Sequence, residues 1–300
     1  MKPPLKILLF GKSGQVGWEL QRSLSPLGEL VALDFDSTDY CGDFSNLTGL
    51  ADTVQRLRPD VIVNAAAHTA VDKAESEPEF ARTLNALAPG VLAKEAAKLG
   101  ALLVHYSTDY VFDGSGTRPW LETDLPAPLS VYGQTKLEAE QLIQAACPNH
   151  LIFRTSWVYA ARGGNFAKTM LRLAEERERL TVIDDQLGAP TGADLLADIT
   201  AHAIRHVLQR PTDAGLYHLV AGDETSWHGY AKHVIAHAER SQLAIKLIVK
   251  TIDPVPTSAF PTPAKRPHNS RLDTTKLQTT FGLRLPNWQH GVDRMLHEII

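Results

Sequence analysis

A short apolar segment, residues 5–10, runs directly into three closely spaced glycines, Gly11, Gly14 and Gly17, and then into a helix-like segment near Trp18. Glycines between a strand and a helix allow a tight turn, a close approach of backbone to phosphate, and close packing of helix on strand. This arrangement is typical of a loop that binds the diphosphate of a dinucleotide. The spacing is G-x-x-G-x-x-G, not G-x-G-x-x-G, so the loop alone is also compatible with an ordinary turn.

Further strand-like segments alternate with helical ones through the first half of the chain. They span residues 30–33, 59–63, 102–106 and 151–155, and we expect the last to be the sixth strand. This alternation predicts an α/β fold with a doubly wound parallel sheet, Rossmann-like, with helices on both faces. Right-handed crossovers place the carboxyl ends of the strands along one edge, so polar residues there should line one cleft.

Several such residues follow the strands. Asp34 comes after the second strand, about 20 positions beyond the glycines, where such folds bind the adenosine ribose hydroxyls. Its charge would disfavour a 2′-phosphate and Lys12 would partly offset that, so we expect NADH or both cofactors and not NADPH alone. Small residues follow the third strand at 64–69, and Thr108 follows the fourth. A ligand can approach the backbone closely there.

Tyr132 and Lys136 lie four residues apart at the start of a predicted helix. Residues at i and i+4 share a helical face, so an ammonium would lie near a phenol. A free tyrosine has a pKa of about 10, and a nearby positive charge should lower it towards the range useful for proton transfer. Such pairs also occur by chance, and only the accompanying strand-end residues make a catalytic role the better interpretation.

The second half is less regular. We expect a dinucleotide-binding domain at 1–156 and a smaller, mixed domain at 157–300 that mainly binds substrate, with some segments returning to the first domain. Helices are predicted at 194–208, 227–240 and 288–299, a helix at about 77–99 in the first half, and a strand at 215–220. A proline-marked loop ends in Lys265, Arg266 and Arg271, and guanidinium groups suit a diphosphate; a solvated surface loop is the alternative.

Composition narrows the class of protein. The chain has 300 residues, a net charge of −4 and two cysteines. There is no basic field for nucleic acid or an anionic membrane, and no cysteine pattern for a disulfide framework or zinc. The apolar run at 7–10 is too short for a signal peptide or a membrane span. We expect a cytoplasmic protein that binds a small molecule.

Several longer motifs carry a resemblance to the extended short-chain dehydrogenase/reductases and, within them, to the dTDP-4-dehydrorhamnose reductase family. The motifs are LFGKSGQVG at 9–17, VNAAAHTAVD at 63–72, HYSTDYVF at 105–112, FRTSWVY at 153–159, DQLGAPT at 185–191 and RPHNSR at 266–271. The resemblance implies NADPH- or NADH-dependent reduction of the 4-keto group of dTDP-4-dehydro-6-deoxy-L-mannose. That is the last step of dTDP-L-rhamnose synthesis for cell-surface polysaccharide, such as lipopolysaccharide O-antigen.

The resemblance also implies roles for individual residues. The catalytic set would be Thr108, Tyr132 and Lys136, where threonine stands in place of the serine common in the family. Sugar-nucleotide contacts would be Thr108, Asp109 and Trp157. Cofactor contacts would include the glycine loop and the two catalytic-helix residues; the full set is Gly11, Gly14, Gln15, Val16, Gly17, Asp34, Asp43, Phe44, Ala67, His68, Thr69, Tyr106, Tyr132 and Lys136.

Some of these residues have simpler interpretations. His68 could be a hydrogen-bonded loop histidine, Tyr106 a packing residue and Trp157 a core aromatic. Asn85 either fixes a water or a backbone kink near Lys136, or lies on a helix surface. Some relatives form homodimers that share a magnesium ion, with carboxylates near Glu19 and Asp194. The resemblance thus implies Mg²⁺ and a homodimer, although lone carboxylates on helices are more often solvated.

Two other activities remain open. The 4,6-dehydratases place an Asp and a Glu after the Thr, whereas this chain has Asp109 and Tyr110, so elimination lacks its second carboxylate. A nucleotide-sugar epimerase of the same fold would use the same catalytic residues, and only the match at 153–191 and 266–271 argues against it. A non-catalytic NAD(P)-binding regulatory subunit is the third reading, since fold alone does not establish activity.

Overall fold

The computed structural model describes residues 4–241 and 246–300. Its centre is a six-stranded parallel sheet with the order β10-β5-β4-β3-β1-β2. The strands are β1 Leu5–Phe10, β2 Gly28–Leu33, β3 Val61–Asn64, β4 Leu102–Thr108, β5 His150–Thr155 and β10 Gly215–His218. The predicted parallel α/β sheet is therefore confirmed. The strand order changes direction between β1 and β3, and ligands bind at such a point in doubly wound folds.

One prediction about the sheet was wrong. Residues 151–155 lie in its fifth strand, and the sixth is β10 from the second half of the chain, with Gly215 opposite Leu151. The first half was expected to supply six strands, but β2 is followed by α2 Leu47–Leu57 without a further strand. The edge position next to β5 is filled instead by a segment that follows α8 Ala193–Gln209.

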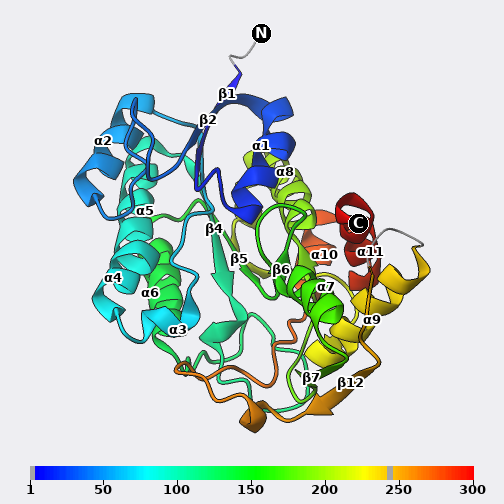
Figure 1. Cartoon of the computed structure of the whole chain (residues 1–300). Helices are drawn as coiled ribbons and strands as arrows, with labels where there is room; N and C mark the ends of the chain where they lie inside the picture. Colours follow the sequence, from blue (N-terminus) through cyan, green and yellow to red (C-terminus); the bar gives the residue numbers. More distant parts are fainter. Residues whose placement is uncertain (1–3, 242–245) are drawn as a thin grey trace.

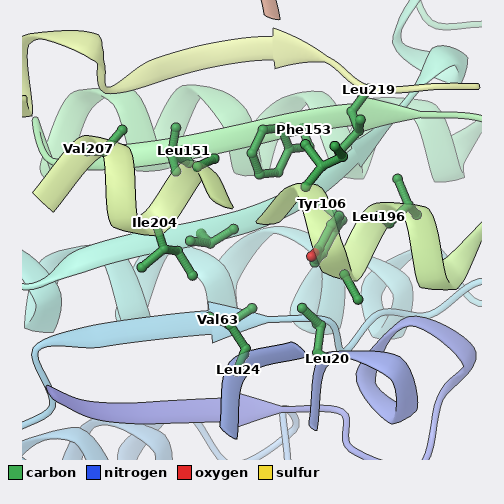
Figure 2. Packing of buried hydrophobic residues seen from close by; sticks show 14 of the residues in the cluster. Leu20, Leu24, Val63, Tyr106, Leu151, Phe153, Leu196, Ile204, Val207 and Leu219 are labelled. Carbon is green, nitrogen blue, oxygen red and sulfur yellow. The ribbon is translucent and has the colours of Figure 1, made fainter. Parts of the chain in front are cut away.

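Alternating side chains of the buried strands supply two apolar layers. Ile7 and Leu9 of β1 point into one layer and Leu8 and Phe10 into the other, because successive residues of a strand face opposite sides. Helices α1 Gln15–Leu24 and α8 cover the first layer; α2, α5 Ala88–Leu99 and α6 Val131–Ala146 cover the second (Figure 1). Figure 2 shows the first layer, in which Leu20 and Leu24 of α1 and Leu196 and Ile204 of α8 pack against the sheet.

The helix expected at about 77–99 is interrupted. It consists of α4 Pro78–Arg82, a π-helical turn at Thr83–Leu87 and α5, and it follows the short helix α3 Val71–Ala74. Pro89 explains the change of hydrogen-bonding pattern, because proline has no N–H to donate and its ring crowds the preceding turn. The turn carries Asn85, which is 1% exposed, so the surface interpretation of this residue was wrong.

The remaining helices form a second group beyond the carboxyl ends of the strands. They are α7 Phe166–Glu176, α9 Trp227–Arg240 and α11 Trp288–Ile299, whereas α10 Thr275–Phe281 packs with α8 and β10 against the first apolar layer. Tyr159, Tyr230 and Trp288 lie in the apolar cluster between α7, α9 and α11. Short strands join this group: β7 Arg179–Ile183 with β12 Thr251–Val255, β6 Val158–Tyr159 with β9 Thr191–Gly192, and β8 Leu187–Gly188 with β11 Thr225–Ser226. Figure 1 shows α7, α9 and α11 on the opposite side from α2 and α5.

The helices predicted at 194–208, 227–240 and 288–299 are confirmed as α8, α9 and α11. Within the described part of the chain, no helix combines the length and apolarity that a bilayer crossing requires.

Candidate active site

The glycine loop joins β1 to α1, which begins at Gln15, three residues before the expected start at Trp18. A side chain at Gly17 would place its Cβ 1.9 Å from the carbonyl oxygen of Gly11, so the helix can lie this close to the loop only with glycine there. The helix cap is Gly14, which has no side chain to occupy the first amides of the helix. The amides around Gln15 and Val16 can therefore bind an anion such as a diphosphate.

Asp34 lies directly after β2 and next to this loop. Its carboxylate accepts hydrogen bonds from the Ser13 amide at 3.0 Å, from the Ser13 hydroxyl, and from the Phe35 amide at 2.9 Å. Partial burial by itself would raise the pKa of Asp34, but these hydrogen bonds and the charge of Lys12 lower it overall. A stable negative charge therefore lies at the position expected to bind the adenosine ribose.

The segment with Asp43 and Phe44 passes beside Asp34. A Cβ at Gly42 would lie 2.3 Å from the Asp34 carbonyl oxygen. The Asp43 carboxylate accepts from the Ser45 amide at 2.8 Å and hydroxyl at 2.7 Å, and the Phe44 ring packs edge-on against Phe10 at 5.4 Å. The structure thus brings these predicted cofactor residues to the same edge of the sheet. The Asp43 side chain hydrogen-bonds within its own turn, and the Phe44 ring packs in the core.

The loop after β3 carries Ala67, His68 and Thr69. The backbone amide of His68 donates to Asn85 Oδ1 at 2.8 Å, and the His68 Nε2 lies 2.6 Å from Glu77 Oε1. His68 is therefore a hydrogen-bonded loop histidine, which was the simpler of its two interpretations. Asn85 Nδ2 reaches the His68 carbonyl at 3.1 Å and the Thr135 hydroxyl at 3.2 Å. The π-helical turn therefore links this loop to the helix that carries Lys136.

Thr108 ends β4, and Asp109 begins a 3₁₀ turn, Asp109–Val111. The Thr108 hydroxyl donates to Asp109 Oδ1 at 3.1 Å and accepts from the Tyr110 amide at 3.1 Å. Burial raises the pKa of Asp109 to about 6, although hydrogen bonds from Ser270 and Thr108 act against it. A buried hydroxyl and a buried carboxyl thus lie side by side at the end of the central strand.

Tyr132 is held beside this turn by the packing of α6. A Cβ at Gly133 would lie 2.2 Å from the Tyr110 carbonyl oxygen, so only glycine allows the helix to approach so closely. The Tyr132 ring meets the Tyr110 ring edge-on at 5.6 Å. Ser130 caps the helix by accepting from the Gly133 amide at 3.2 Å.

The expectation that Lys136 lowers the pKa of Tyr132 was wrong for the protein alone. Burial and the charge of Asp109 raise this pKa to about 12, against a lowering effect of the hydrogen bond with Thr108. The reason is that the Lys136 ammonium is held elsewhere: Nζ donates to the Tyr106 carbonyl oxygen at 2.6 Å and lies 3.1 Å from His105 Nε2. Burial lowers the pKa of Lys136 to about 8, although the charge of Glu140 acts against it.

The Tyr106 side chain does not point into the cleft. Its hydroxyl lies 2.6 Å from the Thr200 hydroxyl of α8, and Figure 2 shows the ring in the apolar layer beneath that helix. The packing interpretation of this side chain holds, and its backbone carbonyl is the part that faces the catalytic lysine.

Several buried polar atoms gather at the ends of β4 and β5. Ser107 Oγ, Asp109 Oδ2, Thr155 Oγ1 and Ser156 Oγ have no hydrogen-bond partner among the residues that the structure describes. Buried polar groups are normally paired, so such a cluster indicates the position of a polar ligand. These atoms and the glycine loop before α1 fit a nicotinamide dinucleotide. It would lie along the carboxyl edge of the sheet, with its diphosphate at the first amides of α1.

A cavity of about 270 Å³ lies next to Tyr132, because Tyr110, which meets the Tyr132 ring edge-on, is one of its walls. The indoles of Trp157 and Trp227 stack along its wall at 3.7 Å and 17°. Trp157 adopts a left-handed backbone conformation with φ of 49°, which is uncommon for a bulky residue and marks strain at a site. Trp157 therefore lines the cavity and is not merely a core aromatic; the other walls are Tyr110, Phe166, Met170, 181–183, Gln186, Phe260, Arg266, Pro267 and Ser270.

The two loop arginines separate. Arg266 lines this cavity and forms a bidentate ion pair with Asp72, at 3.0 and 2.8 Å. Arg271 lines a different cavity and binds Asn269 Oδ1 at 2.8 Å and Glu224 at 3.4 Å. Only the first of them faces the aromatic cavity.

The expected metal ligands are engaged in ion pairs. Glu19 lies 3.3 Å from Arg22, and Asp194 lies 3.4 Å from Arg294. Across residues 4–241 and 246–300, no three or more His, Cys, Asp or Glu side chains are grouped as a metal site would need. The residues of one described chain do not by themselves form a magnesium site.

Sequence reasoning missed the residues behind Lys136. His105 and Asn64 are each 1% exposed, and neither was assigned a role. A signal was present, because His105 interrupts an otherwise apolar strand, and buried polar residues are the informative exceptions in a core. Trp227 was also missed, since its helix was recognised but not the cavity it would line.

Comparison with known proteins agrees with the resemblance. A family model described as the RmlD substrate binding domain matches residues 5–300. The dTDP-4-dehydrorhamnose reductase of Shigella flexneri is 65% identical over 295 residues, 98% of each chain. A solved structure of such a reductase from Clostridium acetobutylicum is 34% identical, with a TM-score of 0.88. One from Bacillus anthracis, solved in complex with NADP, is 33% identical, with a TM-score of 0.86. Each match covers 98% of this chain and 99% of the solved chain. The chain therefore belongs to the dTDP-4-dehydrorhamnose reductase family.

Proposed function

We propose that the chain catalyses the NAD(P)H-dependent reduction of dTDP-4-dehydro-6-deoxy-L-mannose to dTDP-L-rhamnose. The observation that carries this proposal is the position of Thr108 and Tyr132. They lie between the nucleotide-binding edge of the sheet and the aromatic cavity, since Tyr110 meets the Tyr132 ring edge-on and itself lines that cavity. A keto sugar in the cavity would present its carbonyl to the phenol.

The reduced nicotinamide supplies the hydride when it is bound. The protein's part is to bind, orient and protonate. Tyr132 remains protonated at neutral pH because its pKa is raised to about 12, and it donates its proton to the oxygen of the former ketone. Thr108 hydrogen-bonds the same oxygen, and a fixed donor of this kind stabilises the developing charge. Lys136, one turn along the same helix, supplies the positive charge of the catalytic set.

Residues 157–300 bind mainly the sugar nucleotide in this proposal, while residues 1–156 bind mainly the cofactor. The Trp157–Trp227 wall suits a flat thymine ring and the sugar's apolar face, and Arg266 suits the diphosphate. Asp109 binds a sugar hydroxyl through Oδ2, which lies unpaired within the described residues. The epimerase and regulatory-subunit alternatives use the same cleft and are separated by turnover.

Both NADPH and NADH serve as cofactor in this proposal. The Asp34 carboxylate favours the free ribose hydroxyls of NADH, and Lys12 beside it offsets the repulsion of a 2′-phosphate. The relative from Bacillus anthracis was solved with NADP.

A Mg²⁺ ion shared by two copies at Glu19 and Asp194, the homodimer itself and a cytoplasmic location remain predictions. A shared site would need carboxylates from both copies and release of the Arg22 and Arg294 ion pairs. Sedimentation with and without Mg²⁺ tests the first two: a dimer that persists in a chelator removes the ion from the proposal.

The decisive experiment follows the loss of reduced-nicotinamide absorbance with the dTDP-linked 4-keto-6-deoxy sugar, using NADPH and NADH in parallel. Sugar-dependent oxidation that yields dTDP-rhamnose supports the reductase. Interconversion of nucleotide sugars without net oxidation, with the cofactor retained, would indicate an epimerase. Cofactor binding without any sugar conversion would indicate a regulatory subunit.

A further inference from the structure

Lys136 is the end of a hydrogen-bonded chain that begins at a backbone amide. The Ala66 amide donates to Asn64 Oδ1 at 2.9 Å, and Asn64 Nδ2 lies 3.0 Å from His105 Nδ1. His105 Nε2 in turn lies 3.1 Å from Lys136 Nζ. The chain crosses the sheet from β3 through β4 to α6, beneath the cofactor edge.

The direction of the first bonds follows from the chemistry of the groups. A backbone N–H can only donate, so the Asn64 atom facing Ala66 is the carbonyl oxygen and the atom facing His105 is the amide nitrogen. That nitrogen also only donates, so His105 Nδ1 must accept. Burial and the charge of Lys136 lower the pKa of His105 well below its usual value, so the imidazole is neutral and has a single N–H. That N–H is then on Nε2 and points at Lys136.

An N–H directed at Lys136 Nζ cannot bond to an ammonium, which has no lone pair, but it can bond to a neutral amine. We propose that Asn64 and His105 are positioning residues for Lys136, which present an N–H to its nitrogen and so make the lysine release a proton readily. The inference rests on the proposed reductase function for its catalytic meaning. Its structural content, the position of the His105 proton, does not depend on activity.

The proton balance of the reaction gives this arrangement a use. The proton of the Tyr132 phenol passes to the sugar oxygen as the hydride reaches carbon 4, and one proton must then return to the phenolate. Lys136 supplies it as an ammonium N–H and becomes a neutral amine, which the His105 N–H stabilises. Solvent then reprotonates Lys136, so that each turnover takes up one proton in total.

Other groups around Lys136 do not reproduce this effect. The Tyr106 carbonyl accepts from either protonation state of the lysine, and the Glu140 charge favours the ammonium, although Arg154 engages that carboxylate at 2.8 and 2.6 Å. The elements packed around α6 carry further charged or titratable groups. They are His105 and Tyr106 of β4, His150 and Arg154 of β5, Asp109 and Tyr110 of the 3₁₀ turn, Asp72 and Lys73 of α3 with Glu75 after it, Glu79 and Arg82 of α4, Lys94, Glu95 and Lys98 of α5, and Tyr132, Glu138 and Glu140 of α6 itself.

The first test measures the tautomer of His105 directly. Long-range ¹H–¹⁵N spectra of histidine-labelled protein distinguish Nε2–H from Nδ1–H, and the His105→Phe variant identifies the His105 signals among those of the 12 histidines. The proposal requires Nε2–H in the unaltered protein. A proton on Nδ1, or a charged ring at neutral pH, would overturn it whether or not the enzyme turns over.

The second test reverses the donor and acceptor roles along the hydrogen bonds from Asn64 to Lys136. In Asn64→Asp, carboxylate oxygens accept from both the Ala66 amide and His105 Nδ1–H, so Nε2 becomes an acceptor for the Lys136 ammonium. The alkaline limb of kcat/KM for the cofactor should move up by about one pH unit, in the direction expected when a charged group gains a partner, and the His105 signals should change to Nδ1–H. The His150→Phe control, which removes an imidazole from the far end of β5, should leave that limb in place.

A double variant separates the chain from the added charge. If the effect passes through His105, most of the shift caused by Asn64→Asp should disappear in the His105→Phe background. An equal shift in both backgrounds would mean that the new carboxylate acts through space, and the proposal would be wrong. If neither the parent protein nor any variant turns over the sugar, the proposed reductase function is wrong. The His105 tautomer measured by the first test then still decides whether Asn64 and His105 present an N–H to Lys136.

Discussion

Lys136 Nζ lies 2.6 Å from the backbone carbonyl oxygen of Tyr106, so the central strand itself holds the lysine of the candidate site. The same residue sends its phenol to the opposite face, where it bonds to Thr200 at 2.6 Å. Tyr106 therefore connects α8 to the sheet and orients the catalytic helix at once. The Tyr106 side chain packs against α8, and its backbone carbonyl positions Lys136. This residue therefore belongs to the site although its side chain does not point into it.

Replacing Tyr132 with Phe should reduce turnover by about 100- to 10,000-fold, the usual contribution of a positioned acid. The hydroxyl is the only part removed, and the ring keeps its edge-on contact with Tyr110. Cofactor affinity, followed by fluorescence titration with NADPH, should change little. Near-normal turnover in this variant would show that another group protonates the sugar oxygen.

Gly133→Ala should lower both turnover and stability, because its Cβ would lie 2.2 Å from the Tyr110 carbonyl and push α6 away from Thr108. Overpacking of this kind costs about 1–3 kcal/mol of unfolding free energy. Gly164→Ala is the matched control, since a Cβ there meets nothing within 4 Å. Urea unfolding and kcat should be compared for both; equal effects would mean that the close approach at Gly133 is unimportant.

The fold was predictable where local pattern decides it. Helix α8 follows its apolar stripe, α9 and α11 lie where helices were predicted, and Gly11, Gly14 and Gly17 mark the turn from β1 to α1. The place of β10 beside β5 was not predictable in this way, because no local signal says which open edge of a sheet a distant strand will join. The π-helical turn at 83–87 did have a local signal, Pro89, but the prediction of one helix over 77–99 overlooked it.

The same division holds for the site. Tyr132, Lys136 and Thr108 could be proposed from spacing and strand ends, and the structure brings them together. The direction of the pKa shift at Tyr132 could not be predicted, because burial outweighs the charge of a lysine that the Tyr106 carbonyl holds. Spacing along a helix predicts which residues share a face, but not which partners the sheet offers them.

Asp34→Asn should increase the preference for NADPH over NADH. The variant removes a negative charge from the predicted ribose site, while Lys12 remains to attract a 2′-phosphate. We expect the ratio of kcat/KM for the two cofactors to move towards NADPH by about tenfold, which corresponds to about 1.4 kcal/mol. Asp36→Asn, an exposed carboxylate in the same bend, is the control. An unchanged ratio in Asp34→Asn would place the ribose elsewhere.

Asp109→Asn should stabilise the protein at neutral pH but not in acid. Burial raises the pKa of Asp109 to about 6 in the folded state, whereas an unfolded aspartate titrates near 3.8. The folded state therefore binds the extra proton between these values, and the contribution of Asp109 to stability falls as pH rises from about 4 to about 6. An amide bears no charge, so well above pH 6 the variant should gain about 3 kcal/mol, and near pH 4 nothing.

Urea unfolding at pH 4 and pH 7.5 measures this difference, with the exposed Asp39→Asn as control. Equal changes at the two pH values would show that the Asp109 carboxylate is not destabilised by burial. The variant should also bind the sugar nucleotide more weakly, seen as a higher KM, because Oδ2 would become a donor where the proposal needs an acceptor. A residue that destabilises the free protein and strengthens substrate binding is what a functional carboxylate in a buried site should be.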